Sequence, residues 1–393
     1  MIRLKKNLIK IIIITCIFIP IINIKALEIY SENAVLYNMN EDKIIYEKNA
    51  EEKVKIASLT KIMTTIVALE NIDNIKEQTD MPKEALIGLE DYVTTEIKAN
   101  DIITYEDLLY GIMLPSGADC ANAIALKVSG NIDDFVKLMN AKAKELNLEQ
   151  THFSNPIGID EDNYSSVNDI AKLLKYALNN EEFYKIFTTR NYKTSNNIDL
   201  ESTIIEKSEP DNIDTSYILG SKTGFTDDAG NCLASIAKIN NVKYLLVTTK
   251  AGINHSYHIM DATNIYDYFS KNYSYKKVLD YDKYIKTIKI QNGINKDYNI
   301  YADEDAYIYL NNEIDTNELQ YEYEGLEELT KGINKNDKIG KLTIKYNNDI
   351  IYTYDILLNK NITFYNQKLY IGSLIATVLI ALLFVIKRIK KNR

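Results

Sequence analysis

The chain has 393 residues, 26% of them charged, and its formal net charge at pH 7 is −9. Both ends are basic, so the acidic residues lie between them, and a chain of this balance is a poor nucleic-acid binder. Three cysteines are too few for a disulfide framework, and none of the three histidines lies in a zinc-binding pattern, which argues against a metallopeptidase.

Residues 1–26 have the composition of a secretory signal peptide. Basic residues come first, an apolar run follows at 11–22, and Ala26 supplies a small residue at a candidate cleavage point. The run is short for a membrane span, although an uncleaved anchor stays an alternative. We therefore expect an exported chain, in which Cys120 and Cys232 are the only cysteines left. Buried free thiols are favoured over a bridge between them.

Residues 27–272 form the first of two expected domains, because about 340 exported residues exceed one ordinary core. The predicted elements, in chain order, are a hairpin at 34–46, helices through 50–190, a hairpin at 233–248 with an Asn-Asn turn, and a helix at 260–269. Strands at both ends with helices between them predict an α+β domain, in which one antiparallel sheet is flanked by helices.

The first of two informative motifs is Ser58-Leu59-Thr60-Lys61, at the predicted start of a helix. Residues at i and i+3 share a helix face, so Lys61 can lie beside Ser58 and take its proton. A serine hydroxyl is a weak nucleophile that needs such a base. Lys61 serves only if it is neutral near pH 7, and both burial and a second cation lower a lysine pKa.

The second motif is Lys222-Thr223-Gly224, which precedes strand-like sequence. Lys222 is the candidate second cation, and Gly224 allows the backbone to approach a ligand closely. The backbone N–H groups of Phe225 and Ser58 are candidate donors to an oxyanion. Each motif alone is common, because a helix start followed by a surface lysine arises often. In this order and context the two predict serine acyl transfer at the cell wall.

A third segment, Leu114–Asp119, lies between these motifs. In the functional interpretation Ser116 passes protons between Lys61 and the leaving group. The alternative is a helix cap, because Asp119 follows three residues later, as in a capping box. The place of Ser116 between the two motifs favours the functional interpretation.

The composition changes near residue 270. Residues 275–360 are rich in Tyr, Ile, Asn and Lys and alternate in polarity, which predicts a smaller all-β C-terminal domain. Residues 369–386 carry no charge and are followed by a basic tail at 387–393. This predicts a C-terminal transmembrane helix with a cytoplasmic tail and an extracellular catalytic domain. An amphipathic surface helix is disfavoured, because the segment has no polar face.

The chain resembles the low-molecular-mass penicillin-binding proteins of the D-alanyl-D-alanine carboxypeptidase type, serine peptidase family S11. The matching stretches are 34–65, 109–125, 151–174 and 219–237, which include the two motifs and Thr151-His152-Phe153-Ser154-Asn155-Pro156. The resemblance implies a β-lactamase/transpeptidase-like fold. It also implies removal of the terminal D-alanine from the peptidoglycan pentapeptide through an acyl-enzyme on Ser58, inhibition by β-lactams, and no metal or cofactor.

The resemblance further implies substrate-binding roles for the segment Lys222–Phe225. One departure concerns Ala118, where the family usually has an asparagine that contacts the substrate and the active-site lysine. Asp119, Asn122 or water are the candidates to replace that amide. The family also often has a basic residue near position 258 that binds the substrate carboxylate. Here His258 occupies that place, and Arg190 is another candidate, although a solvated arginine is favoured.

Two rival functions belong to other classes. A β-lactamase-like hydrolase would share Ser58 and Lys61 but needs a second carboxylate base, and residues 151–169 show no suitable motif for one; Glu161 and Asp162 are interpreted as solvated loop. A non-catalytic peptidoglycan- or penicillin-binding protein would keep the fold and lose turnover, and Ala118 motivates that alternative. Release of D-alanine, hydrolysis of penicillin, or neither, separates the three functions.

Overall fold

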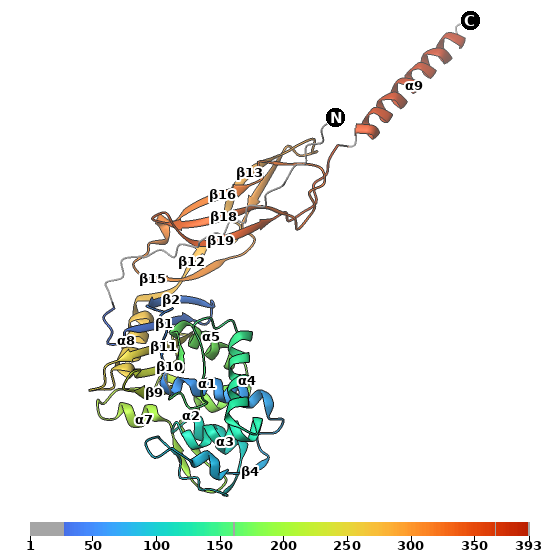
Figure 1. Cartoon of the computed structure of the whole chain (residues 1–393). Helices are drawn as coiled ribbons and strands as arrows, with labels where there is room; N and C mark the ends of the chain where they lie inside the picture. Colours follow the sequence, from blue (N-terminus) through green and yellow to red (C-terminus); the bar gives the residue numbers. More distant parts are fainter. Residues whose placement is uncertain (1–26, 160–161, 366, 392–393) are drawn as a thin grey trace, which may run out of the picture. The chain divides into compact units, whose positions relative to one another are not determined.

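The computed structural model describes residues 27–159, 162–365 and 367–391 (Figure 1). The described chain divides into two compact units, with the boundary between Lys271 and Asn272. The predicted signal peptide at 1–26 and the last two residues of the basic tail lie outside the described residues.

A five-stranded antiparallel sheet forms the centre of the first unit. Its strands, in spatial order, are β2 (Lys43–Lys48), β1 (Asn33–Asn38), β11 (Val242–Ala251), β10 (Gly230–Ile239) and β9 (Ile218–Thr226). β1 pairs with β11, so the first and last hairpins of this unit join in one sheet. Both predicted hairpins are confirmed. Asn240 and Asn241 turn the second one with φ of 51° and 65°, which asparagine tolerates.

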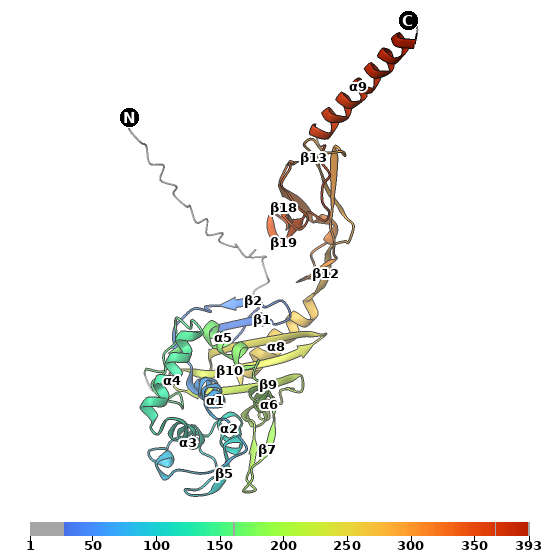
Figure 2. The ribbon, with the colours of Figure 1, turned by 90° about the vertical axis from the view of Figure 1, so that its right-hand side faces the viewer.

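Helices cover both faces of this sheet. They are α1 (Thr60–Asn71), α2 (Tyr105–Met113), α3 (Ala118–Ser129), α4 (Ile132–Glu145), α5 (Val167–Ala177), α6 (Glu181–Thr188), α7 (Thr203–Ser208) and α8 (Tyr257–Asn272). On one face Tyr37 of β1 donates to the Asn168 side chain of α5 at 2.8 Å. On the other face the Ser235 and Tyr266 hydroxyls join β10 to α8 at 2.9 Å. In both views α1 lies between the sheet and the pair α2 and α3 (Figures 1 and 2).

Polar side chains cap four of these helices at their first turns, where the backbone N–H groups have no partner within the helix. Thr104 and Asp107 form a capping box at α2, and Asn131, Ser166 and Asn180 accept from the first turns of α4, α5 and α6. Shorter elements complete the unit: η1 (Ala57–Leu59), η2 (Lys83–Leu86), β3 (Val54–Lys55) with β6 (Tyr164–Ser165), β4 (Gln78–Asp80) with β5 (Ile102–Thr104), and β7 (Asn191–Lys193) with β8 (Asp199–Glu201). The predicted α+β class, an antiparallel sheet flanked by helices, is confirmed.

The second unit is built from three small sheets around its own apolar core. The sheets are β12 (Tyr273–Leu279) with β15 (Ala306–Asn311), β14 (Asp297–Tyr301) with β13 (Tyr284–Ile290) and β17 (Glu328–Leu329), and β16 (Gln320–Gly325) with β18 (Lys338–Tyr346) and β19 (Asp349–Leu357). A single turn of 3-10 helix, η3 (Thr316–Glu318), precedes β16. The smaller all-β C-terminal domain is therefore confirmed.

The described chain ends in helix α9 (Gln367–Lys391). Its segment Ile371–Arg388 has a mean hydropathy of 2.1, and none of that segment is buried. By length and composition it is a candidate membrane anchor.

Candidate active site

The turn that contains Ser58 lies against the edge of the central sheet. Ser58 is in η1, the 3-10 turn that directly precedes α1, and η1 packs against the edge strand β9. The approach is close at Gly224, where a Cβ atom would lie 3.0 Å from the backbone nitrogen of Ser58. The side-chain-free residue of the second motif therefore lets β9 reach the serine, and the two motifs meet although they are far apart in sequence.

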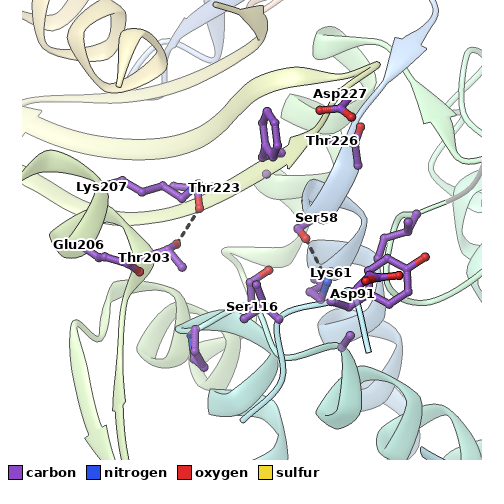
Figure 3. A pocket seen from close by; sticks show the side chains of 17 residues that line it. Ser58, Lys61, Asp91, Ser116, Thr203, Glu206, Lys207, Thr223, Thr226 and Asp227 are labelled. Atoms are coloured by element: carbon purple, nitrogen blue, oxygen red, sulfur yellow. Dashed lines mark hydrogen bonds between the residues drawn. The ribbon is translucent and has the colours of Figure 1, made fainter. Parts of the chain in front are cut away.

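A cavity of about 530 Å³ opens at this junction. Figure 3 shows Ser58, Lys61, Ser116 and Thr223 around it. Gly224 and Phe225 of β9 complete the wall on the sheet side. The structure thus brings residues from all three sequence motifs to one cavity.

Lys61 is placed to act as a base. Its Nζ lies 3.0 Å from Ser58 Oγ and 2.9 Å from the backbone oxygen of Ile157. The side chain is 1% exposed. Burial lowers the pKa of Lys61 to about 7, against the opposing attraction of Asp119 in α3. At neutral pH a large fraction of this amine is therefore free to accept a proton.

Ser116 lies in the connection between α2 and α3 with φ of 70°, a conformation that is uncommon for serine. It does not cap α3, whose N-cap is Gly117 without a side-chain hydrogen bond. Asp119 accepts instead from the backbone and hydroxyl of Thr95, at 3.0 and 2.6 Å, so the capping-box alternative is wrong. Within the described chain no hydrogen bond engages the Ser116 hydroxyl, which leaves it available on the cavity wall.

Lys222 is 0% exposed and lies behind the wall rather than in it. Its Nζ donates to the backbone oxygen of Thr223 at 2.9 Å. Burial holds the pKa of Lys222 well below its usual value, and the charges of Lys61 and Lys207 act in the same direction. Thr223 itself lines the cavity, and its hydroxyl lies 2.7 Å from that of Thr203.

Lys207 is a cavity residue that sequence reasoning missed. It lies in α7, which packs against β9, and its side chain runs toward Thr223 in Figure 3. The side chain is half-buried, and no described carboxylate lies within ion-pair distance of its amine. Burial lowers the pKa of Lys207, opposed by the neighbouring Glu206. No motif marks this lysine, because only the packing of α7 brings it to the cavity.

The two carboxylate-binding candidates from the sequence lie elsewhere. His258 is 1% exposed in α8 and does not line the cavity, and burial lowers its pKa to about 3. Arg190 donates to the backbone oxygens of Thr215 and Ile218, so it fastens the start of β9. The favoured interpretation, a solvated arginine, is wrong in that these backbone oxygens bind the guanidinium, and the alternative of a carboxylate clamp at the cavity is wrong because Arg190 does not line it.

The surroundings of Ala118 also differ from expectation. Asp119 is turned to Thr95, and the Asn122 amide donates to the backbone oxygen of Ala85 at 3.4 Å. Neither side chain lines the cavity, so neither replaces the missing amide. The Ala118 N–H donates to the backbone oxygen of Val93 at 2.8 Å, which brings the loop of residues 91–93 to this wall.

Other sequence expectations have mixed outcomes. Cys120 and Cys232 are free and buried, as favoured. Glu161 lies outside the described residues, and Asp162 is exposed in a turn, as expected for solvated loop. Three of the cavity-lining residues are carboxylates, namely Asp91, Glu206 and Asp227.

Two family models match the chain, one over most of the first unit and one over the β-rich part of the second. The family model for D-alanyl-D-alanine carboxypeptidases, peptidase family S11, matches residues 22–252, and that for the C-terminal domain of penicillin-binding protein 5 matches residues 273–363. D-alanyl-D-alanine carboxypeptidase DacF of Bacillus subtilis is 27% identical over 330 residues, which are 82% of this chain and 83% of that protein. The D-alanyl-D-alanine carboxypeptidase of Streptomyces sp. K15 is 30% identical over 245 residues, 57% of this chain and 81% of that protein.

The solved structures show the same architecture. Penicillin-binding protein 5 from Haemophilus influenzae superposes with a TM-score of 0.66 at 23% identity, covering 86% of this chain and 98% of that one. That identity supports the fold alone, whereas the first family model covers more than half of the sequence. The chain therefore belongs to the D-alanyl-D-alanine carboxypeptidases of peptidase family S11, with the fold of a penicillin-binding protein.

Proposed function

We propose that this chain is a serine-type D-alanyl-D-alanine carboxypeptidase that shortens peptidoglycan stem peptides through an acyl-enzyme on Ser58. The observation that carries the proposal is the contact of 3.0 Å between Lys61 Nζ and Ser58 Oγ, in a cavity where the pKa of Lys61 is about 7. A buried lysine that is largely neutral at physiological pH is the base that a serine nucleophile requires.

In the first half of the reaction, Lys61 takes the proton of Ser58 while Oγ attacks the carbonyl carbon of the penultimate D-alanine. The carbon–nitrogen bond then breaks, and the proton passes from Lys61 to the departing amine through Ser116. In the second half, a water molecule gives a proton to Lys61 and attacks the ester carbon. The tetrahedral intermediate that forms then breaks its bond to Ser58 Oγ, which frees the shortened peptide, and Lys61 returns the proton to Oγ. Lys61 is therefore neutral at the start and at the end of the reaction.

We propose that the backbone N–H groups of Ser58 and Phe225 bind the oxyanion. β9 is an edge strand, so half of its N–H groups point away from β10. Gly224 holds that edge close to Ser58. Donors of this kind are typically worth about 10²–10³ in rate each.

The substrate carboxylate is assigned to Thr223 and Lys207. Both line the cavity, and Lys207 is a cation without a described acidic partner. Lys222 is fully buried, so we assign it a supporting role behind the wall, where its Nζ donates to the backbone oxygen of Thr223 and steadies the strand that lines the cavity. A free terminal carboxylate is what distinguishes a carboxypeptidase substrate from an internal peptide bond.

We further propose that the enzyme acts outside the cell. The signal-like segment at 1–26 supports export, and the apolar stretch of α9 followed by basic residues supports a C-terminal anchor with a cytoplasmic tail.

Two measurements on the purified protein test the proposal. Intact mass after benzylpenicillin treatment, with peptide mapping, should show one adduct on Ser58 that disappears in Ser58→Ala. Incubation with diacetyl-Lys-D-Ala-D-Ala should release D-alanine. Rapid hydrolysis of the penicillin would support the β-lactamase-like function instead. A stable adduct without D-alanine release would support the non-catalytic penicillin-binding function.

A further inference from the structure

We propose that the loop of residues 154–159 is a positioning device for the general base, in which Asn155 holds the loop and the backbone oxygen of Ile157 orients Lys61. The inference rests on the proposed function, because it concerns the same serine and lysine. It adds Asn155 and Gly158 as positioning residues that act on the reaction without touching the substrate.

The carboxamide of Asn155 closes the loop from inside. Its Oδ1 accepts hydrogen bonds from the backbone N–H groups of Ile157, Gly158 and Ile159, at 3.1, 2.8 and 3.4 Å. Asparagine side chains characteristically organise the backbone just after them in this way. One side-chain oxygen therefore fixes three consecutive peptide units.

The closed loop aims two backbone oxygens at α1. The oxygen of Ile157 accepts from Lys61 Nζ at 2.9 Å, and that of Pro156 accepts from the Thr64 hydroxyl at 2.6 Å. Lys61 and Thr64 are one helical turn apart on the same face. Two hydrogen bonds therefore join the loop to the first turns of α1, the helix that carries Lys61.

The loop also packs against η1, the turn that contains Ser58. Gly158 has φ of 88°, and a Cβ atom there would lie 2.0 Å from the backbone oxygen of Ala57. Ala57 directly precedes Ser58 and itself has φ of 46°, which is unusual for alanine. Strain of this kind persists only where neighbouring structure enforces it. Gly158 is therefore required where the loop packs against the backbone of the serine turn.

This arrangement determines which way the lone pair of the Lys61 amine points. A neutral amine has two N–H donors and one lone pair. With one N–H donated to the Ile157 oxygen, the lone pair can face the Ser58 hydroxyl, 3.0 Å from the nitrogen. Without that acceptor the amine could rotate and present an N–H to the serine, an orientation that accepts no proton.

The same contact affects the protonation of Lys61. A carbonyl oxygen binds an ammonium more strongly than an amine, so it raises the pKa of the lysine. Asp119 of α3 also raises the pKa of Lys61, and the charge of Lys61 in turn lowers the pKa of the buried Lys222 in β9. Neither Asp119 nor Lys222 contacts Asn155, so a variant at Asn155 leaves both in place.

The test compares three variants by the second-order rate of acylation by benzylpenicillin between pH 5 and 9. Asn155→Ala removes the acceptor that closes the loop. Asn155→Asp keeps an acceptor of the same shape and adds a negative charge. The matched control is Asn163→Ala, because Asn163 binds the other end of the same loop, at the Ser154 backbone and hydroxyl.

For Asn155→Ala we expect a loss of at least tenfold in maximal rate, with the pH midpoint lowered by about one unit through loss of the carbonyl contact. Asn155→Asp should regain most of the rate at high pH, with its midpoint above that of the wild type. Asn163→Ala should keep the wild-type midpoint.

A role in stability alone predicts a different pattern. It would lower the melting temperature of the variants without moving the midpoints in opposite directions. A folded Asn155→Ala with wild-type rate and midpoint would overturn the inference, as would the same shift in Asn163→Ala. If Asn155→Ala does not fold, an unmoved midpoint in Asn155→Asp would overturn it. Absence of any adduct on Ser58 in the wild type would refute the proposed function instead.

Discussion

Replacement of Lys207 by alanine should separate recognition of the substrate carboxylate from acyl transfer itself. In the structure Lys207 is a half-buried cation on the cavity wall without an ion-pair partner among the described residues. A hydrogen bond between charged groups at such a site contributes about 1.5–3 kcal/mol, which corresponds to a loss of about 10- to 100-fold in kcat/KM. The loss should appear only for substrates that end in a free carboxylate.

The assay compares diacetyl-Lys-D-Ala-D-Ala with the same peptide ending in a carboxamide. The wild type should prefer the acid, and Lys207→Ala should lose most of that preference while turnover of the amide changes little. Lys127→Ala is the matched control, because Lys127 is a partly buried lysine paired with Asp80, away from the cavity. An equal loss for both peptides, or an unchanged preference for the acid, would refute the assignment of the carboxylate to Lys207.

Three further changes test the remaining parts of the proposal. Lys61→Ala should lose acylation by about 10³-fold or more. The acylation rate of the wild type should rise with pH through a midpoint near 7, because only the neutral amine of Lys61 accepts a proton. A flat profile from pH 5 to 9 would contradict this role. Truncation after Asn366 should give a soluble, active enzyme, and membrane association of that product in a fractionation assay would argue against α9 as the sole anchor. Ala118→Asn should change kcat/KM for diacetyl-Lys-D-Ala-D-Ala by about tenfold or less, since an amide adds one or two hydrogen bonds of about 0.5–1.5 kcal/mol each. If only Ala118→Asn released D-alanine, the natural protein would be a binder.

The sequence predicted best where the chemistry is local. Ser58 and Lys61 are three residues apart at a helix start, so their contact follows from helix geometry alone. The Asn240-Asn241 turn likewise fixes its own hairpin. The sequence predicted that the two hairpins belong to one sheet, but not which of their strands pair. β1 and β11 are far apart in the sequence, and no local pattern marks them as neighbours.

Residues whose roles depend on packing between distant segments were missed or misplaced. Asp119 stands where a capping box would put it, yet its carboxylate turns to Thr95, a contact that depends on how the loop before α2 folds over α3. Arg190 has the chemistry of a carboxylate clamp but satisfies backbone oxygens at the start of β9. A side chain with several donors takes the nearest unsatisfied acceptors, and only the tertiary structure shows which these are.

Ala118 lies on the cavity wall at the start of α3. The family resemblance implies that an amide is missing at position 118, and Asp119 and Asn122 were the candidates in the chain to replace it. The structure turns both Asp119 and Asn122 away and brings the loop of residues 91–93 to the wall instead. Lys61, the proposed base, needs no amide from position 118, because its Nζ already has two partners, the Ser58 hydroxyl and the backbone oxygen of Ile157. We therefore expect Ala118 to cost a contact to the substrate rather than the supply of a base. Such a loss lowers affinity more than it lowers the rate of acyl transfer, so we expect a modified enzyme rather than an inactive one.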